Sequence, residues 1–171
     1  VVEEKVQNNK KTIITAILAV VVIAAAVIFF LDMRQESANA ANDAIGQADM
    51  SLAQGNDSIA LVQYMQVADN EGYDAGNRAA LQAAILLYKK GDYQKALDYL
   101  AKYSQKEALV GAASFSLEGD CYVNLEKYPE AVKSFEKAID ASDDNAFYTP
   151  LFMIKQANVY RALKEYNKEA A

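Results

Sequence analysis

The sequence predicts an all-α protein in which a single transmembrane helix is followed by a solenoid of helical hairpins. Three observations support this fold class: a long uncharged apolar run near the N-terminus, helical units that recur with a period in the mid-thirties, and the absence of strand patterns. No alternating apolar and polar segment is bounded by Asn-Gly or Asp-Gly turns, and the chain has only two prolines.

The apolar run covers residues 13–31 and carries no charged side chain. At about 1.5 Å rise per residue a helix of this length spans about 28 Å, close to the ~30 Å hydrocarbon core of a bilayer. Thirteen of its nineteen residues are Ile, Leu, Val or Phe, so membrane insertion is favourable by about 4 to 8 kcal/mol. The predicted membrane-anchor side chains are Ile13, Ile14, Ile17, Leu18, Val21, Val22, Ile28, Phe29, Phe30 and Leu31.

Two other interpretations of this run stay open at the level of sequence. A helix buried in a protein core seldom lacks a polar face over such a length, and the later helices are too few to enclose it. A cleaved signal peptide has a shorter apolar region that ends in a small-x-small cleavage site. Residues 29–34 hold no such site, and the nearest candidate lies around residues 37–40, well beyond the run. We therefore favour an uncleaved anchor.

The charges on either side of the run predict the orientation. Three lysines precede it, whereas only Arg34 follows it closely, and an excess of Lys and Arg marks the cytoplasmic side. We expect residues 1–12 to be cytoplasmic, residues 13–31 to span a bacterial inner membrane once, and residues 32–171 to form a periplasmic repeat domain. The chain begins without a methionine and stops inside a repeat motif, so we expect it to be a segment of a longer protein.

The part after the run has the size and charge of one soluble acidic domain. Its 140 residues are enough for a real hydrophobic core. It carries 14 basic and 21 acidic residues, and this net charge of −7 repels nucleic acid and anionic lipid surfaces. No stripe of Lys and Arg interleaved with aromatic residues occurs, so a nucleic-acid partner is not predicted.

No residue pattern in the chain indicates catalysis. Histidine is absent, and the single cysteine, Cys121, lies in an apolar helical stretch where a buried, inert thiol is expected. Glycine-rich phosphate loops are absent, and the acidic cluster at residues 140–144 lacks the Gly and later Glu of a calcium loop. We predict no enzyme activity, catalytic residue, metal, cofactor or small-molecule substrate.

Three segments share a plan of helix, tight turn, tyrosine and second helix. The tyrosines after the turns, Tyr93, Tyr128 and Tyr166, are 35 and 38 residues apart. A helical-hairpin period of this length is typical of tetratricopeptide repeats. We predict three such units, the third of which has its second helix starting at Tyr166. An unrelated helical bundle is the alternative.

The residue types at the repeat positions have a packing rationale. In the second unit Gly119 lets the paired helices approach closely, and Tyr122 fills the adjacent space on the same helix face. Tyr128 closes the turn between both helices. The predicted packing residues are Tyr93 and Ala96 in the first unit, Gly119, Tyr122, Tyr128, Ala131 and Phe135 in the second, and Ala157, Tyr160 and Tyr166 in the third.

Turn residues and capping residues predict the helix boundaries. The membrane helix is expected to continue outward and to end near Gly46 or Gly55, before a short helix over residues 59–68. Asn77 is predicted to cap the next helix after a loop, and Thr149 to cap the first helix of the third unit.

A repeat solenoid presents the inner faces of its first helices to another polypeptide. The predicted lining of this groove is Arg78, Leu81, Ile85 and Tyr88 from the first unit, Asp120 and Asn124 from the second, and Asn158 and Arg161 from the third. Such a mixed apolar and polar lining suits an extended or helical segment. Simple solvent exposure of these side chains is the alternative.

With these parts in place, the chain resembles the YfgM-type proteins, particularly their Bacteroidota-style relatives. The segments 73–77, 117–122, 140–145 and 148–152 are similar to theirs. The resemblance implies an ancillary subunit of the Sec translocon, associated with SecYEG and with a PpiD-like membrane-anchored chaperone, that assists exported chains or their chaperones near the channel exit. Two other functions stay open: a general cell-envelope scaffold with a passive anchor, and a regulator whose catalytic domain lies outside this segment.

Overall fold

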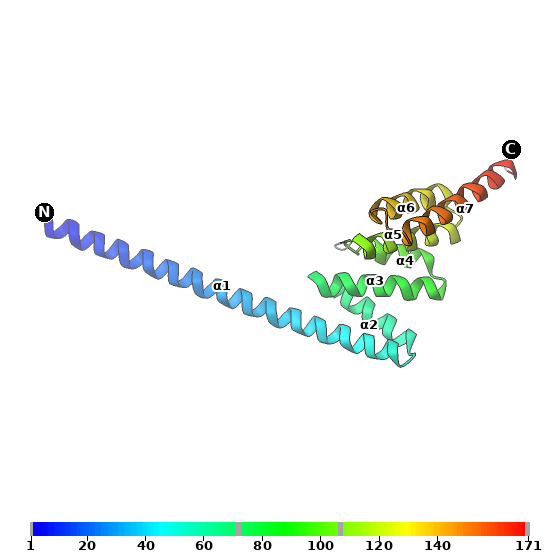
Figure 1. Cartoon of the computed structure of the whole chain (residues 1–171). Coiled ribbons are helices and arrows are strands. Elements are labelled where there is room, and N and C mark those ends of the chain that lie inside the picture. Colours follow the sequence, from blue (N-terminus) through cyan, green and yellow to red (C-terminus); the bar gives the residue numbers. More distant parts are fainter. Residues whose placement is uncertain (1, 71–72, 106–107, 170–171) are drawn as a thin grey trace. The chain divides into compact units, whose positions relative to one another are not determined.

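The computed structural model describes residues 2–70, 73–105 and 108–169, and within these ranges it contains helices and no strands (Figure 1). The chain divides into two compact units, Val1–Asn42 and Asp43–Ala171. The all-α class predicted from the sequence is therefore confirmed.

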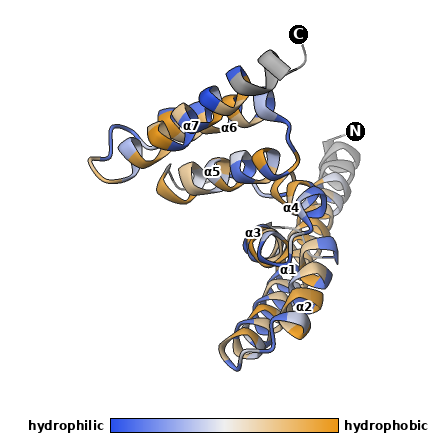
Figure 2. Ribbon diagram, turned by 90° about the vertical axis from the view of Figure 1, so that its right-hand side faces the viewer, coloured by the Kyte–Doolittle hydropathy of each residue, from blue (hydrophilic) through white to orange (hydrophobic). Residues whose placement is uncertain are grey.

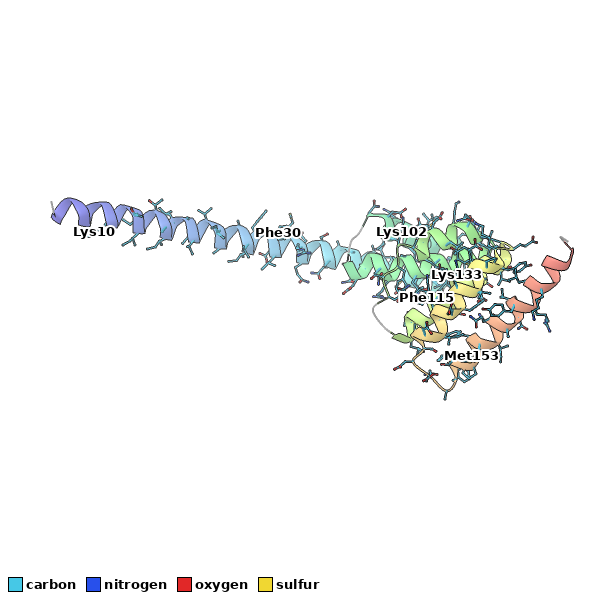
Figure 3. The ribbon with its side chains drawn as sticks, turned by 90° about the horizontal axis from the view of Figure 1, so that it is seen from above. Lys10, Phe30, Lys102, Phe115, Lys133 and Met153 are labelled. Atoms are coloured by element: carbon cyan, nitrogen blue, oxygen red, sulfur yellow. The ribbon has the colours of Figure 1, made fainter. Side chains whose placement is uncertain are left out.

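The first unit consists of the long helix α1 (Val2–Ala53) up to Asn42. Every side chain of residues 13–31 is exposed, and Phe29 has the largest exposed fraction among its large apolar residues, 72%. Figure 3 shows the apolar side chains, Phe30 among them, projecting from an uncovered helix. The helix is long and apolar enough to cross a membrane, and no residue of its most apolar 18-residue stretch is buried. A helix from a protein core would instead be covered by its neighbours.

Helix α1 continues past Gly46 and ends at Ala53, as the sequence predicts for the second of its two candidate breaks. Gly55 follows with a φ of 77°, a left-handed conformation that glycine adopts without steric cost. The helix thus extends from the apolar run into the second unit.

The second compact unit, Asp43–Ala171, is a row of helices in which each one from α2 onward contacts the next (Figure 2). It begins with residues 43–53 of α1, which continue through a short turn into α2. The other helices are α2 (Asp57–Asn70), α3 (Tyr73–Lys90), α4 (Tyr93–Leu100), α5 (Ala108–Asn124), α6 (Tyr128–Ala141) and α7 (Tyr148–Glu169).

Three turns in this row have the same backbone geometry. Gly55, Gly91 and Glu126 adopt φ values of 77°, 85° and 58°, and they are 36 and 35 residues apart. In each turn the next backbone N–H bonds the carbonyl five residues back, which is the Schellman arrangement that closes a helix. These bonds are Asn56 N to Ser51 O, Asp92 N to Leu87 O, and Lys127 N to Tyr122 O, all 2.9 Å long.

The first of these turns belongs to a helix pair that the sequence analysis did not recognise as a repeat unit. Ala60, Tyr64 and Val67 of α2 are buried and have the spacing of Ala131, Phe135 and Ala138 in α6. The Tyr64 hydroxyl donates a hydrogen bond to the carboxylate of Asp49, near the end of α1. Residues 43–70 therefore form a hairpin ahead of the three predicted units.

The prediction that Asn77 caps a helix is wrong, because α3 already begins at Tyr73. Asp74 lies in the first turn of α3, where a negative charge stabilises the helix dipole. The side chain of Asn77 instead holds the chain after α4: its Nδ2 donates to the carbonyl of Ser104 (2.9 Å), and its Oδ1 accepts from the Ser104 N–H (2.5 Å).

Thr149 is also not the N-cap that the sequence predicts. Helix α7 begins at Tyr148, and the side-chain oxygen of Asn145 accepts the N–H groups of Phe147 (3.1 Å) and Tyr148 (3.0 Å). An asparagine at this place satisfies the free donors of the first turn. Thr149 is buried, and its hydroxyl lies 2.6 Å from that of Ser142.

The turn predicted before Tyr166 is not formed, because α7 continues as a helix to Glu169. Residues 162–169 contain no Gly or Pro, and six of the eight are the good helix formers Ala, Leu, Lys and Glu. No described helix packs against this end of α7 to stabilise a turn. The local preference of these residues for helix therefore determines their structure. The side chain of Tyr166 lies outside the described part of the structure.

The second predicted repeat unit, α5 with α6, contains a close contact between its two helices. A Cβ atom added to Gly119 would lie 2.8 Å from the ring of Phe135, so these helices approach more closely than any larger residue permits. Ala131 and Phe135 are buried, and Tyr122 and Tyr128 are partly buried against the same cluster. Pro129 lies in the first turn of α6, where its missing N–H is not needed.

Cys121 on α5 is fully buried, as the sequence predicts. Burial, together with the negative charges of Asp120 and Glu118, raises the pKa of its thiol to about 12. The thiol is therefore protonated at neutral pH.

Candidate polypeptide-binding groove

A hollow with a volume of about 460 Å³ is lined by α3, α5 and α7, and we call it the groove. Nine of its twelve lining residues are apolar or aromatic, and the other three are Ser116, Asp120 and Lys155. The apolar residues are Leu81 and Ile85 on α3, Leu109, Val110, Ala113 and Leu117 on α5, and Tyr148, Leu151 and Phe152 on α7.

Helix periodicity explains why these residues share one surface. The lining residues of α5 recur every three or four positions from Leu109 to Asp120, so they lie on one helix face. Leu81 and Ile85 on α3 are four residues apart, as are Leu151 and Lys155 on α7. The first helix of each hairpin therefore contributes the same kind of face.

An ion pair occupies the polar part of the groove. Nζ of Lys155 lies 2.5 Å from Oδ2 of Asp120 and 3.1 Å from the Ser116 hydroxyl. The side chains of Lys155 and Asp120 are 32% and 26% exposed, so water screens this pair less than a fully exposed one. The lysine ammonium also lies 5.7 Å from the centroid of the Phe135 ring.

The structure brings four of the eight predicted groove residues to hollows on this surface. Leu81, Ile85 and Asp120 line the groove. Asn158 lines a smaller adjoining hollow of about 200 Å³, which also includes Asp120 and Lys155.

The other four predicted residues do not line either hollow and have partners of their own. Arg78 lies 3.8 Å from the carboxylate of Asp49, and Arg161 donates a hydrogen bond of 3.5 Å to the Asn158 side chain. Asn124 donates to the carbonyl of Asp120. Tyr88 packs against Tyr93 with ring centroids 5.5 Å apart, and burial raises the pKa of its hydroxyl.

Sequence reasoning did not include Lys155 in the groove, although a signal for it exists. Asp120 on α5 is equivalent to Asn158 on α7, 38 residues later, and Lys155 lies three residues before Asn158 on the same helix face. Stacked repeats bring equivalent positions next to each other. A basic residue one turn from the predicted groove residue Asn158 would therefore have been expected within reach of Asp120.

The packing residues of the three predicted units are placed differently. In the first repeat unit Ala96 is buried and Tyr93 is half-buried. In the third unit Ala157 and Tyr160 are exposed on α7, Tyr160 to 48%.

The groove has the chemistry of a binding surface. Within the described residues no group of three His, Cys, Asp or Glu side chains is placed to hold a metal ion. The Ser116 hydroxyl contacts a lysine ammonium that is itself paired with a carboxylate. An all-helical row of hairpins with an apolar groove defines a scaffold for protein–protein interaction.

Comparison with known protein families matches residues 44–161 to the tetratricopeptide repeat-like domain, and this match covers more than half of the chain. The chain belongs to the tetratricopeptide repeat-like domain family, whose fold is typically non-catalytic. The match begins within α1 and so includes the additional hairpin at residues 43–70. A comparison with curated proteins found no match.

Solved structures share the fold. One is the first tetratricopeptide repeat domain of Spaghetti (RPAP3) bound to the HSP90 peptide SRMEEVD, with a TM-score of 0.58 and 17% identity over 72% of this chain and 93% of that one. Another is MamA, residue 41 to the end, from Desulfovibrio magneticus RS-1. Its TM-score is 0.54, with 17% identity over 75% of this chain and 72% of that one.

Proposed function

We propose that this protein is a membrane-anchored interaction module that binds a polypeptide in the groove as an ancillary subunit of the SecYEG translocon. The observation that carries the binding role is the groove, in which apolar side chains of three successive first helices remain open to solvent. Leu109 and Leu151 are 45% and 43% exposed, so a ligand that covers them gains hydrophobic stabilisation.

A polypeptide is the ligand class that the fold favours. The structurally similar domain of Spaghetti is bound to a peptide. The likeness is one of fold, at a TM-score of 0.58 and 17% identity, so the residues of this groove determine which peptide binds.

The apolar part of α1 is proposed to anchor the domain in an inner membrane, with residues 1–12 in the cytoplasm and the repeat domain in the periplasm. The lysines before the run favour this orientation. A tether raises the effective concentration of the groove for partners at the same membrane. Protease added to intact spheroplasts should digest the repeat domain. Protection until the cells are lysed would contradict the orientation.

The association with SecYEG and with a PpiD-like chaperone rests on the resemblance to YfgM-type proteins. The test is affinity purification of the full chain from native membranes in mild detergent, with mass-spectrometric identification of the proteins that accompany it. The proposal expects translocon subunits with the wild-type chain and fewer with a variant whose groove is blocked by Ala113→Trp. Recovery of other envelope proteins without any translocon subunit would favour the general cell-envelope scaffold.

A further inference from the structure

Charge in the groove indicates what kind of polypeptide it holds. Among the described residues that line it, Lys155 is the one basic side chain and Asp120 the one acidic side chain, and they pair with each other. Building on the proposed function, we infer that the groove binds an apolar, uncharged polypeptide segment and that Asp120 sets this specificity by neutralising Lys155.

An acidic ligand would meet two obstacles. It would have to compete with Asp120 for the ammonium of Lys155, and it would leave that carboxylate without its partner in a partly desolvated site. The net charge of −6 adds a general repulsion. Repulsion between a carboxylate of the site and a competing acidic ligand is a common source of specificity.

A basic ligand meets the converse obstacle, because pairing with Asp120 would release Lys155. The arginines near the groove are already engaged, Arg78 with Asp49 and Arg161 with Asn158. Only an uncharged ligand leaves every charged group of the groove with its present partner.

The apolar residues define the anchors that the ligand needs. They form one continuous strip along α5, with Leu81 and Ile85 on one side and Leu151 and Phe152 on the other. A strip of this kind accepts large aliphatic side chains from one face of a helix, spaced at i, i+4 and i+7. The ligand is thus an uncharged amphipathic segment, such as an apolar stretch of a chain that has not yet folded.

The experiment compares two fluorescent peptides of equal length with blocked termini. Both carry leucines at i, i+4 and i+7; one has Gln and Ser at the other positions, and the second has Glu at several of them. Binding is measured by fluorescence anisotropy to the full chain in lipid nanodiscs, with empty nanodiscs as the baseline. We expect the wild-type chain to bind the uncharged peptide about tenfold more tightly than the acidic one.

Three variants assign the preference to the ion pair. Asp120→Asn keeps a hydrogen-bonding side chain but frees the lysine charge, so affinity for the acidic peptide should rise about fivefold. Glu136→Gln removes an acidic group from the exposed face of α6 and should leave both affinities unchanged. The double variant Asp120→Asn/Lys155→Gln should lose the gain.

The outcomes distinguish a failure of this inference from a failure of the proposed function. If the acidic peptide binds the wild-type chain as tightly as the uncharged one, the inference is overturned and the proposed function stands. If neither peptide binds, both are overturned. An Asp120→Asn chain with wild-type helix content and an unchanged ratio of affinities would remove Asp120 from its assigned role. The wild-type comparison stands even if this variant fails to fold.

Discussion

Helices α5 and α7 carry the same repeat motif, yet the face that bears the motif is covered by another helix only on α5. Phe115, Gly119 and Tyr122 of α5 are buried or half-buried, and Phe115 and Tyr122 pack against clusters that include α6 residues. The equivalent residues 38 positions later, Met153, Ala157 and Tyr160, are exposed (Figure 3 labels Phe115 and Met153). The motif therefore marks a face that accepts a helix, whereas burial depends on whether that helix is there.

The opposite side of α7 is packed like the rest of the row. Phe152 and Val159 are buried, the first with Ala112 and Ala138 and the second with Ala131 and Phe135. Helix α7 is thus held through its contacts with the α5/α6 hairpin. Substitutions at equivalent positions on α5 and α7 should consequently differ in their effect.

Removing the aromatic ring that covers Gly119 should cost the most. Phe135 is 1% exposed, and Phe135→Ala should lower the free energy of unfolding by about 3–5 kcal/mol, through lost burial and the resulting cavity. Met153→Ala, at an exposed site on α7, should change it by less than about 0.5 kcal/mol. Urea unfolding of the solubilised full chain, followed by circular dichroism, measures both. Equal losses would contradict the comparison.

The two helices should also differ in thiol reactivity. The pKa of about 12 for Cys121 arises first from burial and then from Asp120 and Glu118, so maleimide should not label it at about pH 8. A cysteine at position 157, in an Ala157→Cys/Cys121→Ala chain, should react about a hundredfold faster because residue 157 is exposed.

The same raised pKa has a consequence for stability. The folded state favours the protonated thiol, so its contribution is fully present below the ordinary thiol pKa and is lost as pH rises towards 12. Rapid labelling of Cys121 in the folded chain would contradict the packing of α5.

Overpacking at the close contact should have a smaller effect. Gly119→Leu places atoms where the Phe135 ring lies, so we expect a loss of about 1–3 kcal/mol in unfolding free energy. Ala157→Leu is the matched control on α7, and it should be within about 0.5 kcal/mol of wild type because nothing described covers that face. A larger loss at position 157 than at 119 would reverse the comparison.

The smallest effect is expected at the turn that α7 lacks. Glu126 has a φ of 58°, a conformation that costs a non-glycine residue about 1 kcal/mol, so Glu126→Gly should stabilise the chain by up to about that amount. Lys164 lies two residues before Tyr166, as Glu126 lies two before Tyr128, but it is helical. Lys164→Gly should therefore destabilise by up to about 1 kcal/mol. Thermal melts measure both variants, and a rise in Tm for Lys164→Gly as well as for Glu126→Gly would indicate a turn at Lys164.

Much of the fold could be predicted from the sequence because it depends on local pattern. The apolar run, the helical class and the packing of Gly119 against α6 follow from periodicity and residue size. The caps did not follow. At α7 the capping side chain is Asn145, three residues before Tyr148, rather than Thr149. The Asn77 side chain is instead used by the distant Ser104. Local sequence does not reveal such tertiary partners.

Two further features were missed for physical reasons. The hairpin formed by the end of α1 and α2 was missed because its first helix continues the apolar run without a break. The turn before Tyr166 was predicted by analogy with Tyr128, yet a turn without Gly needs a packed second helix to hold it, and α7 has none among the described residues. In the groove, half of the predicted residues line a hollow, and the ion pair that sets its charge required the stacking of two repeats.

The most direct test of the central claim is photo-crosslinking of the groove in living cells. A benzophenone amino acid at position 113, an exposed residue on the groove-lining face of α5, should form adducts with a polypeptide. The same probe at position 136 on the exposed face of α6 should form few. Absence of adducts at 113, or equal yields at both positions, would contradict a polypeptide-binding role for this groove.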